Sequence, residues 1–443
     1  MKQYKHEKHL QQHHRLRKKF SRSIRVLGPG VITGAADDDP SGIATYSQAG
    51  AGMGYGLLWM IPAMFPMLLA VQGTCSRIGA VTGRGLAAIL RDHFSKKVLF
   101  FAVGLAVTAN IINIGADLGA MAAALQLLFP ALPFMAAAIG FTVLILALVI
   151  FVKYKTYARI LKWLAVVLFA YPITAFIVGQ PWPEVFMHTL TPQLSLSDGT
   201  IYLIVGLLGT TISPYLFFWD TSEVIEDEIA SKRLGIFGKK PPKITKHFLR
   251  SVRIDNFVGM SLAAVTAWFI MLTCATVLFS QGTTEINTAA DAARAIEPLV
   301  AGFPNAGLVA KIIFSVGIIG LGLLAVPVLA GSSSYAISES FGWREGLYRR
   351  MKKAEGFYGI IIAATVVGLL INFSGINPIQ ALIFSAVFNG IAAVPLLAMI
   401  AIVGRNEKIM GEYRNGKLVT SFVWLAFAVM GIAALVLIGS LFV

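Results

Sequence analysis

Eleven long apolar segments constrain the fold of this chain more than any other feature. Most run for about 20 residues or more and are apolar on every side, as an α-helix must be to cross the hydrocarbon core of a bilayer. Only 13% of the residues are charged, against roughly 25% in soluble domains. We therefore predict an all-α polytopic membrane protein. The expected spans are residues 26–48, 54–76, 98–129, 133–152, 158–179, 199–229, 254–280, 306–336, 356–374, 378–403 and 420–442.

The basic residues predict the orientation of these spans. If the N-terminus is cytoplasmic, 35 of the 37 Lys and Arg residues fall in the N-terminal tail or in cytoplasmic loops, and only Arg294 and Lys311 do not. This is the positive-inside pattern, so the formal charge of +15 indicates a membrane surface and not a nucleic-acid partner. We expect the plasma (inner) membrane of a prokaryote, with the C-terminus outside.

Residues 1–25 form a basic cytoplasmic tail without the apolar core of a cleavable signal peptide. Four of the seven histidines lie in it, so it is either a metal-sensing tract or, as we favour, a disordered segment on an anionic leaflet. The two cysteines, Cys75 and Cys274, lie in apolar stretches and are predicted to be small buried hydrophobes, not a disulfide or a metal pair.

Two of the spans carry helix-breaking residues near their middle. The first contains Gly-Ala-Ala-Asp-Asp-Asp-Pro-Ser-Gly at 34–42, and the sixth contains Gly-Thr-Thr-Ile-Ser-Pro-Tyr at 209–215. Unwound backbone within a bilayer is tolerated only where it faces a cavity or ligand. Two such breaks five spans apart predict an inverted five-plus-five repeat with its substrate site at mid-membrane. We expect this ten-helix transport domain at 26–403, with a linker and an eleventh helix at 404–443.

Three consecutive aspartates, Asp37, Asp38 and Asp39, lie at the first break. Acids inside a membrane are costly and mark functional sites by default. The plainer alternative is that they cap the half-helix that begins at Pro40, since Asp before Pro is ordinary capping chemistry. Capping needs only one aspartate, so we predict a cation-binding role for at least Asp39.

The stretch 28–59 and the Val-Thr-Gly-Arg at 81–84 resemble the NRAMP family of divalent-metal transporters. The resemblance implies the leucine-transporter fold, alternating access, and a metal site between the first and sixth helices. It carries over the ligand roles of the Asp39 carboxylate and of the Ala36 and Thr210 carbonyls.

Two ligand positions of the family are changed here. Gly42 stands where the family has asparagine, and Ser213 stands where it has methionine. This pattern is similar to the NRAMP-related magnesium transporters. Carboxylate, carbonyl, hydroxyl and water ligands suit hard ions, so Asp39, together with Asp38, is predicted to hold a partly hydrated Mg²⁺. Ser213 is predicted to contact the ion through a water; the alternative is that it is only a small residue at a helix contact.

The proton-pathway positions of the family also differ. Asp117 matches an aspartate of the third helix, but Asn110 and Ala120 replace two glutamates. Tyr215 and Asp220 replace the two histidines of the sixth helix. Asn389 matches a supporting glutamine of the tenth helix. Asp220 and the nearby Glu223 form either an acidic inner vestibule or ion pairs with the basic loop at 232–253.

We therefore predict a transporter, not an enzyme, that imports Mg²⁺ as an uncoupled uniporter, with no cofactor and no obligate protein partner besides the bilayer. The main alternative is a proton-coupled Mn²⁺/Fe²⁺ importer. An amino-acid transporter of the same fold is less expected, because three aspartates would repel a substrate carboxylate. A channel is disfavoured by the two broken helices.

Overall fold

The computed structural model describes residues 34, 36–152, 156, 164–193, 198–230, 234, 244–440 and 442, whose regular elements are α-helices and short 3-10 helices. The predicted tail at 1–25 lies outside these residues. Eight described helices are long and apolar enough to cross a bilayer, or up to nine if a bent pair counts as one span. The bent pair joins Pro40–Leu57 to Met60–Thr82 at 112°.

The first half of the chain contains helices that overlap the first six predicted spans. Residues 26–33 and 35 of the first span and 158–163 of the fifth lie outside the described residues. Their bounds are α3 (Pro40–Met53), α4 (Met60–Thr82), α6 (Lys96–Leu128), α7 (Phe134–Phe151), α9 (Ala170–Val178) with the 3-10 turn Leu164–Phe169 before it, α11 (Asp198–Thr211) and α12 (Pro214–Ala230).

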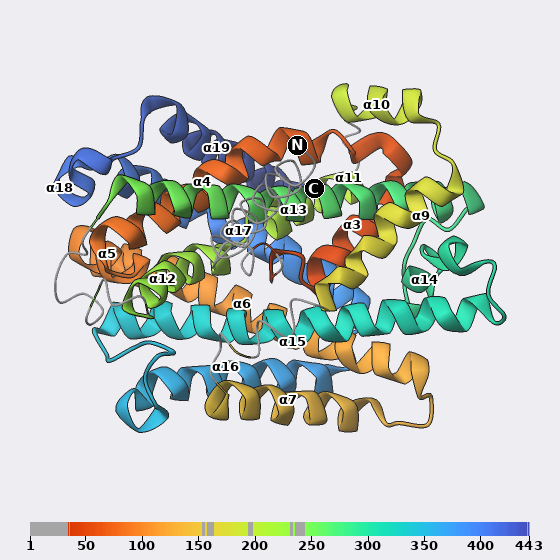
Figure 1. Cartoon of the computed structure of the whole chain (residues 1–443), viewed down its shortest axis with the longest axis horizontal. Coiled ribbons are helices and arrows are strands. Elements are labelled where there is room, and N and C mark those ends of the chain that lie inside the picture. Colours follow the sequence, from red (N-terminus) through yellow and green to blue (C-terminus); the bar gives the residue numbers. More distant parts are fainter. Residues whose placement is uncertain are drawn as a thin grey trace, which may run out of the picture.

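The second half contains five further spans. Their bounds are α13 (Lys246–Val277), α15 (Ala306–Phe341), α16 (Glu355–Ile371), α17 (Pro378–Arg405) and α19 (Lys417–Ser440). The helices run side by side, with α7, α15 and α16 on one side of the bundle and α4, α13 and α19 on the other (Figure 1). The central helix α6 packs against α15, α16 and α17.

The predicted position of the second span is wrong by about two helical turns. The second span was expected at 54–76, but α4 covers Met60–Thr82, six residues later at both ends. A 3-10 turn at Gly54–Leu57 precedes it, and Gly54 has a φ of 55°. The residues on both sides of this turn are apolar, so the hydrophobic pattern did not mark where one helix ends and the next begins.

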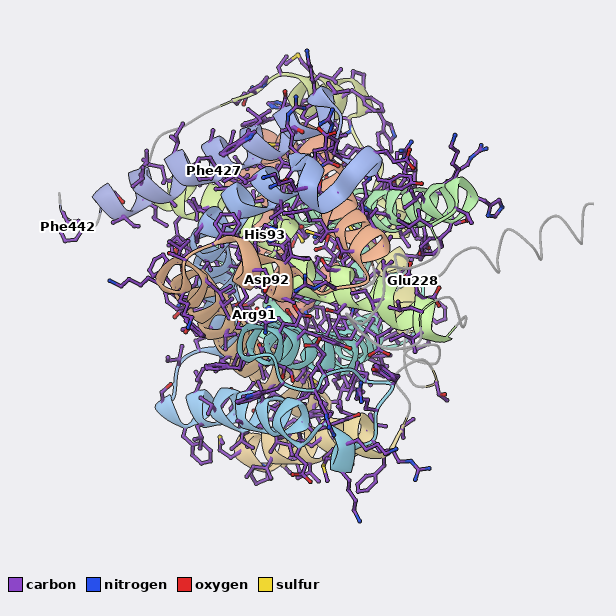
Figure 2. The ribbon with its side chains drawn as sticks, turned by 90° about the vertical axis from the view of Figure 1, so that its left-hand side faces the viewer. Arg91, Asp92, His93, Glu228, Phe427 and Phe442 are labelled. Carbon is purple, nitrogen blue, oxygen red and sulfur yellow. The ribbon has the colours of Figure 1, made fainter. Side chains whose placement is uncertain are left out.

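Several predicted loops contain short helices. These are α5 (Leu86–His93), α10 (Trp182–Leu190), α14 (Ala289–Arg294) and α18 (Glu407–Met410). In α5, Leu86, Ala87 and Leu90 are fully buried, so this loop packs on the bundle. The helices α5 and α18 lie at one end of the bundle, and α10 and α14 at the opposite end (Figure 1). Figure 2 views the end that carries α5, with Arg91, Asp92 and His93 facing the viewer.

Helix α13 begins earlier than predicted, at Lys246 instead of 254. The hydroxyl of Thr245 caps it by accepting a hydrogen bond from the backbone N–H of Phe248 (3.2 Å). Such a cap satisfies one of the free N–H groups at the helix start. The first turns of α13 are therefore polar and helical, which a search for apolar runs does not detect.

Two glycines allow the sixth-span helices to pack closely on their neighbours. A Cβ on Gly209 of α11 would lie 2.1 Å from the carbonyl oxygen of Ala386 in α17. A Cβ on Gly79 of α4 would lie 2.3 Å from the carbonyl oxygen of Thr221 in α12. In both contacts a glycine lies directly against the backbone of the neighbouring helix, the close packing that small residues permit in membrane helices. They fix α11 and α12 against the rest of the bundle.

Candidate functional site

The first break lies where the three aspartates are. Residues 36 and 37 are helical, Asp38 and Asp39 are not, and α3 starts at Pro40. Asp39 is the N-cap of α3, and its Oδ1 accepts hydrogen bonds from the N–H of Gly42 and the hydroxyl of Ser41, both at 2.7 Å. Asp39 is 1% exposed. The residue that caps α3 is therefore also a buried carboxylate.

The second break is short and separates α11 from α12 at Ile212 and Ser213. The hydroxyl of Ser213 donates to the carbonyl oxygens of Gly209 and Thr210, both at 2.8 Å. Ser213 therefore covers carbonyls that the end of α11 leaves without a helical partner. Pro214 follows as the first residue of α12, where its missing N–H costs nothing.

The two breaks are in contact with each other. The hydroxyl of Tyr215, just after the second break, donates to the carbonyl oxygen of Ala36, just before the first (2.8 Å). On the other side, a Cβ on Gly42 would lie 3.1 Å from Oγ1 of Thr210. The predicted positions Ala36, Gly42 and Thr210 are thus brought together around the two interruptions.

The carbonyls of Ala36 and Thr210 each accept a hydrogen bond from a hydroxyl, from Tyr215 and Ser213 respectively. A carbonyl oxygen has two lone pairs, so each retains acceptor capacity after this bond. The arrangement thus offers two polarised carbonyl oxygens beside one carboxylate, which is a donor set for a hard cation.

Helix α6 contributes a residue that the sequence analysis missed. Nδ2 of Asn113 donates to Oδ2 of Asp39 (2.8 Å), and the hydroxyl of Ser385 in α17 donates to Oδ1 of Asn113 (2.8 Å). The spacing could have revealed it, because Asn113 lies four residues before Asp117 and so shares its helix face. A chain of hydrogen bonds thus runs from α17 through α6 to the candidate site.

Asn110 does not join this chain. Its amide nitrogen lies 3.0 Å from the hydroxyl of Ser333 in α15, so it contacts α15 and no described bond links it to Asp39. Asp117, in contrast, is fully buried, and neither of its carboxylate oxygens has a hydrogen-bond partner among the described residues.

Two further polar groups are buried without partners. Both amide atoms of Asn389 in α17 lack one within the described ranges, and so does the hydroxyl of Thr210. Asn389 lies four residues after Ser385 and therefore on the same face of α17. Such groups cost free energy when buried without a hydrogen bond. Both groups therefore have unused hydrogen-bonding capacity for a polar or charged ligand.

The carboxylates do not form a multi-acid cage. Asp37 and Asp38 are both buried, and Oδ1 of Asp37 has no partner among the described residues. No group of three or more His, Cys, Asp or Glu side chains that could hold a metal occurs in the part of the chain described. The carboxylate of Asp39, in contrast, is held in place by hydrogen bonds from Ser41, Gly42 and Asn113.

Asp220 and Glu223 lie further along α12. Asp220 accepts a hydrogen bond from the hydroxyl of Ser76 in α4, and Glu223 accepts one from the indole of Trp219 (3.0 Å). Half of the basic loop at 232–253 that is proposed as their ion-pair partner, namely residues 232, 233 and 235–243, lies outside the described ranges. Both predicted roles for these acids therefore stay predictions.

A family model described as natural resistance-associated macrophage protein-like matches residues 30–440 of this chain. The divalent metal cation transporter MntH of Clostridium acetobutylicum is 29% identical over 423 residues, covering 89% of this chain and 86% of its own length. MntH of Bacillus subtilis is 27% identical over 416 residues, covering 92% of this chain and 90% of its own length.

Solved structures show the same arrangement of helices. A manganese transporter from Eremococcus coleocola superposes with a TM-score of 0.70 at 18% identity, over 94% of this chain and 86% of that one. MhsT, solved with L-phenylalanine, superposes with a TM-score of 0.62 at 12% identity, over 92% of this chain and 98% of that one. The predicted leucine-transporter-like fold is confirmed.

Proposed function

This chain belongs to the Nramp family, and from that premise we propose that it carries divalent metal cations across a membrane by alternating access. The observation that supports this most directly is the buried carboxylate of Asp39 at the contact of two interrupted helices. A charge buried in a membrane protein is costly unless it is paired or serves a substrate. In the described structure, Asp39 has hydrogen bonds but no basic partner.

We assign the ligand roles as follows. Asp39 supplies the charge, and the carbonyls of Ala36 and Thr210 supply neutral oxygens. Ser213 acts indirectly, since its hydroxyl already donates to the Thr210 carbonyl, and Gly42, which has no side chain, lets the two segments lie close together at Thr210. Asn113 orients Asp39, and Asn389 with Asp117 lines the surrounding polar region. Asp38 is a further oxygen donor if its carboxylate turns toward the ion.

The comparisons favour Mn²⁺ over the Mg²⁺ preferred from sequence. The relatives are named as divalent metal cation transporters, one structural neighbour is a manganese transporter, and none is named for magnesium. An oxygen-only donor set suits Mn²⁺ as well as Mg²⁺. Mn²⁺ is therefore the first candidate substrate.

Mg²⁺ is the second candidate because of one specific observation. Ser213 stands where the family has a thioether, and no sulfur is close to Asp39 in the two broken segments. A site without a soft ligand loses a means of preferring transition metals over Mg²⁺. An ion that keeps several of its waters would bind through Asp39 and the two carbonyls.

We further propose the predicted topology: a cytoplasmic N-terminus, an external C-terminus and the plasma membrane. The division into a tail at 1–25, a transport domain at 26–403 and a terminal unit at 404–443 is part of the same proposal. The orientation is supported by the basic loops that flank α5, α16 and α18 at one end of the bundle.

Asp39→Asn tests the proposal in proteoliposomes loaded with an indicator for Mn²⁺ or Mg²⁺. Asparagine caps a helix about as well as aspartate, so the variant should fold and elute normally, yet lose nearly all uptake of both ions. Ser41→Ala, which removes one hydrogen bond to the same carboxylate, is the matched control and should retain most uptake. Near-normal uptake by Asp39→Asn would refute the site.

A further inference from the structure

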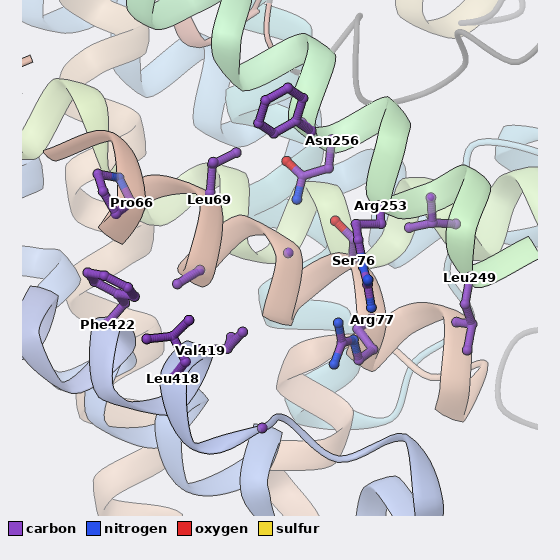
Figure 3. Close-up of a pocket in the computed structure, with 15 residues that line it drawn as sticks. Pro66, Leu69, Ser76, Arg77, Leu249, Arg253, Asn256, Leu418, Val419 and Phe422 are labelled. Carbon is purple, nitrogen blue, oxygen red and sulfur yellow. The ribbon is translucent and has the colours of Figure 1, made fainter. Parts of the chain in front are cut away.

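A groove between three membrane helices suggests a second site, separate from the two helix breaks. It has a volume of about 510 Å³ and lies between α4, α13 and α19 (Figure 3). Arg77 from α4 and Arg253 from α13 lie close together at one end of it (Figure 3). We propose that this groove binds a phospholipid with an anionic headgroup, whose phosphate contacts the two arginines.

The arginines are available to an anion. Neither forms an ion pair with any described carboxylate, and the single hydrogen bond of Arg77 goes to the neutral Oδ1 of Asn415 (3.2 Å). Two guanidinium groups that face each other without a counter-charge repel one another. A phosphate between them removes that repulsion and takes bidentate hydrogen bonds from each.

Apart from Ser76 and Asn256, the rest of the groove is apolar and suits an acyl chain. Its walls include Pro66 and Leu69 of α4, Phe257 of α13, and Phe422 of α19. Phe257 is 52% exposed and Leu418, at the rim, is 72% exposed. Exposed side chains of this kind on a membrane helix face lipid. A soluble anion or a polar peptide would gain nothing from these walls.

The dimensions and the position agree with one lipid leaflet. Pro66 and Arg77 are eleven residues apart in one helix, a rise of roughly 16 Å. Half the hydrocarbon thickness of a bilayer is about 15 Å. The basic end of the groove lies near the C-terminal end of α4, close to α18 and the basic residues around it. Basic pockets between membrane helices at such a surface are typical sites for anionic headgroups.

The groove also contacts the transport machinery. Ser76 lines it and donates its hydroxyl to Asp220 of α12, the helix that follows the second break. A bound lipid therefore lies one side chain away from a helix that must move during alternating access. We expect occupancy of the groove to stabilise the packing of α4 against α12.

Native mass spectrometry of the full-length protein in detergent tests the proposal. Phosphatidylglycerol should bind the wild type more tightly than phosphatidylethanolamine does. The double variant Arg77→Gln, Arg253→Gln should weaken phosphatidylglycerol binding about 30-fold, since each arginine near a membrane surface contributes on the order of 1 kcal/mol. The control, Lys352→Gln with Lys353→Gln, removes two exposed charges elsewhere and should bind like the wild type.

A second variant blocks the groove without changing charge. Gly73 lines it, and a Cβ there would lie 3.4 Å from Nδ2 of Asn256, which is ordinary contact. Gly73→Leu should therefore fold and should lose phosphatidylglycerol adducts. The proposal is overturned if Gly73→Leu binds as the wild type does, if both charge-removal variants lose binding equally, or if glycerol phosphate alone competes fully with the lipid.

Discussion

At the scale of single residues, Asp39 combines a structural role as a helix cap with the ligand role proposed for it. Its Oδ1 caps α3, while its Oδ2 is held by Asn113 from another helix. Each oxygen thus has a defined direction before any ion arrives. Preorganisation of this kind reduces the free energy spent on ordering a site during binding.

The contribution of this preorganisation of Asp39 to ion binding can be tested at Asn113. Asn113→Leu keeps the size of the side chain but removes the bond to Oδ2 of Asp39, and a hydrogen bond to a charged group contributes roughly 1.5–3 kcal/mol. We expect KM for the transported ion to rise by tenfold or more, with a smaller fall in maximal rate, in a proteoliposome uptake assay.

Ser385 provides the matched control for that experiment. Its hydroxyl donates both to Asn113 and to the carbonyl oxygen of Leu382 (2.7 Å), so the Asn113 variant leaves it satisfied. Ser385→Ala should change KM in the same direction but by less. Unchanged uptake in both variants would mean that Asp39 is oriented without help from α6.

The residues show why the site was predictable in part. Asp39, Ala36, Gly42, Thr210, Ser213 and Tyr215 lie at helix interruptions that proline and glycine mark in the sequence, and the structure gathers them. Asn113 and Ser385 lie inside uninterrupted helices, where the only local signal is the four-residue spacing of Asn113 from Asp117. Their role arises only when α3, α6 and α17 pack together, which is information that one sequence does not display.

At the scale of helices, the two breaks are not equivalent. At the first, the Asp39 carboxylate is held by Ser41, Gly42 and Asn113 of α6, whereas the second is closed on itself by the Ser213 hydroxyl. Helices α11 and α12 even satisfy the length and hydropathy criteria as one continuous span, Gly199–Ala230. The proline therefore predicted that the sixth span is interrupted, but not that the interruption is so short.

The second break can be altered to test selectivity. Ser213→Met combined with Gly42→Asn restores the ligand types of the wider family and should raise the ratio of Mn²⁺ to Mg²⁺ uptake at least several-fold, because a thioether favours softer ions. The new amide must displace the Thr210 hydroxyl, which lies 3.1 Å from the position of a Cβ on Gly42. Competition between the two ions in proteoliposomes measures the ratio.

Ser213→Leu with Gly42→Asn is the control for that change. Leucine matches methionine in size and removes the same hydroxyl, but it has no sulfur. If the leucine variant shifts the ratio as much as the methionine variant does, cavity size and not the thioether sets the preference. An unchanged ratio in the methionine variant would remove Ser213 from the selectivity argument.

At the scale of the whole molecule, hydrophobic runs predicted the helices better than their junctions. The spans at 306–336 and 378–403 match α15 and α17 closely, because polar residues flank both. The turn between α3 and α4 was misplaced because it is itself apolar. Inverted symmetry was predictable from two breaks five spans apart, whereas the short helices α5, α10 and α14 depend on tertiary packing.

The driving force for transport also belongs to the scale of the whole molecule. Proton symport needs titratable groups along a path through the bundle. Helices α3, α6, α11 and α12 contain no histidine, and Asn110, Ala120 and Tyr215 do not titrate near neutral pH. Asp117 is the acid of α6 that could carry a proton, since it is buried without a described partner.

We expect uncoupled, electrogenic uptake that is driven by the membrane potential. A potential of 100 mV contributes roughly 2.3 kcal/mol per charge and so twice that for a divalent ion, which concentrates the ion inward without protons. A pH-sensitive dye inside liposomes, read during influx at a fixed potential, should show no acidification beyond that of protein-free vesicles. Acidification that follows uptake, is absent in Asp39→Asn and is reduced in Asp117→Asn would instead establish proton coupling through Asp117, as the Mn²⁺ alternative requires.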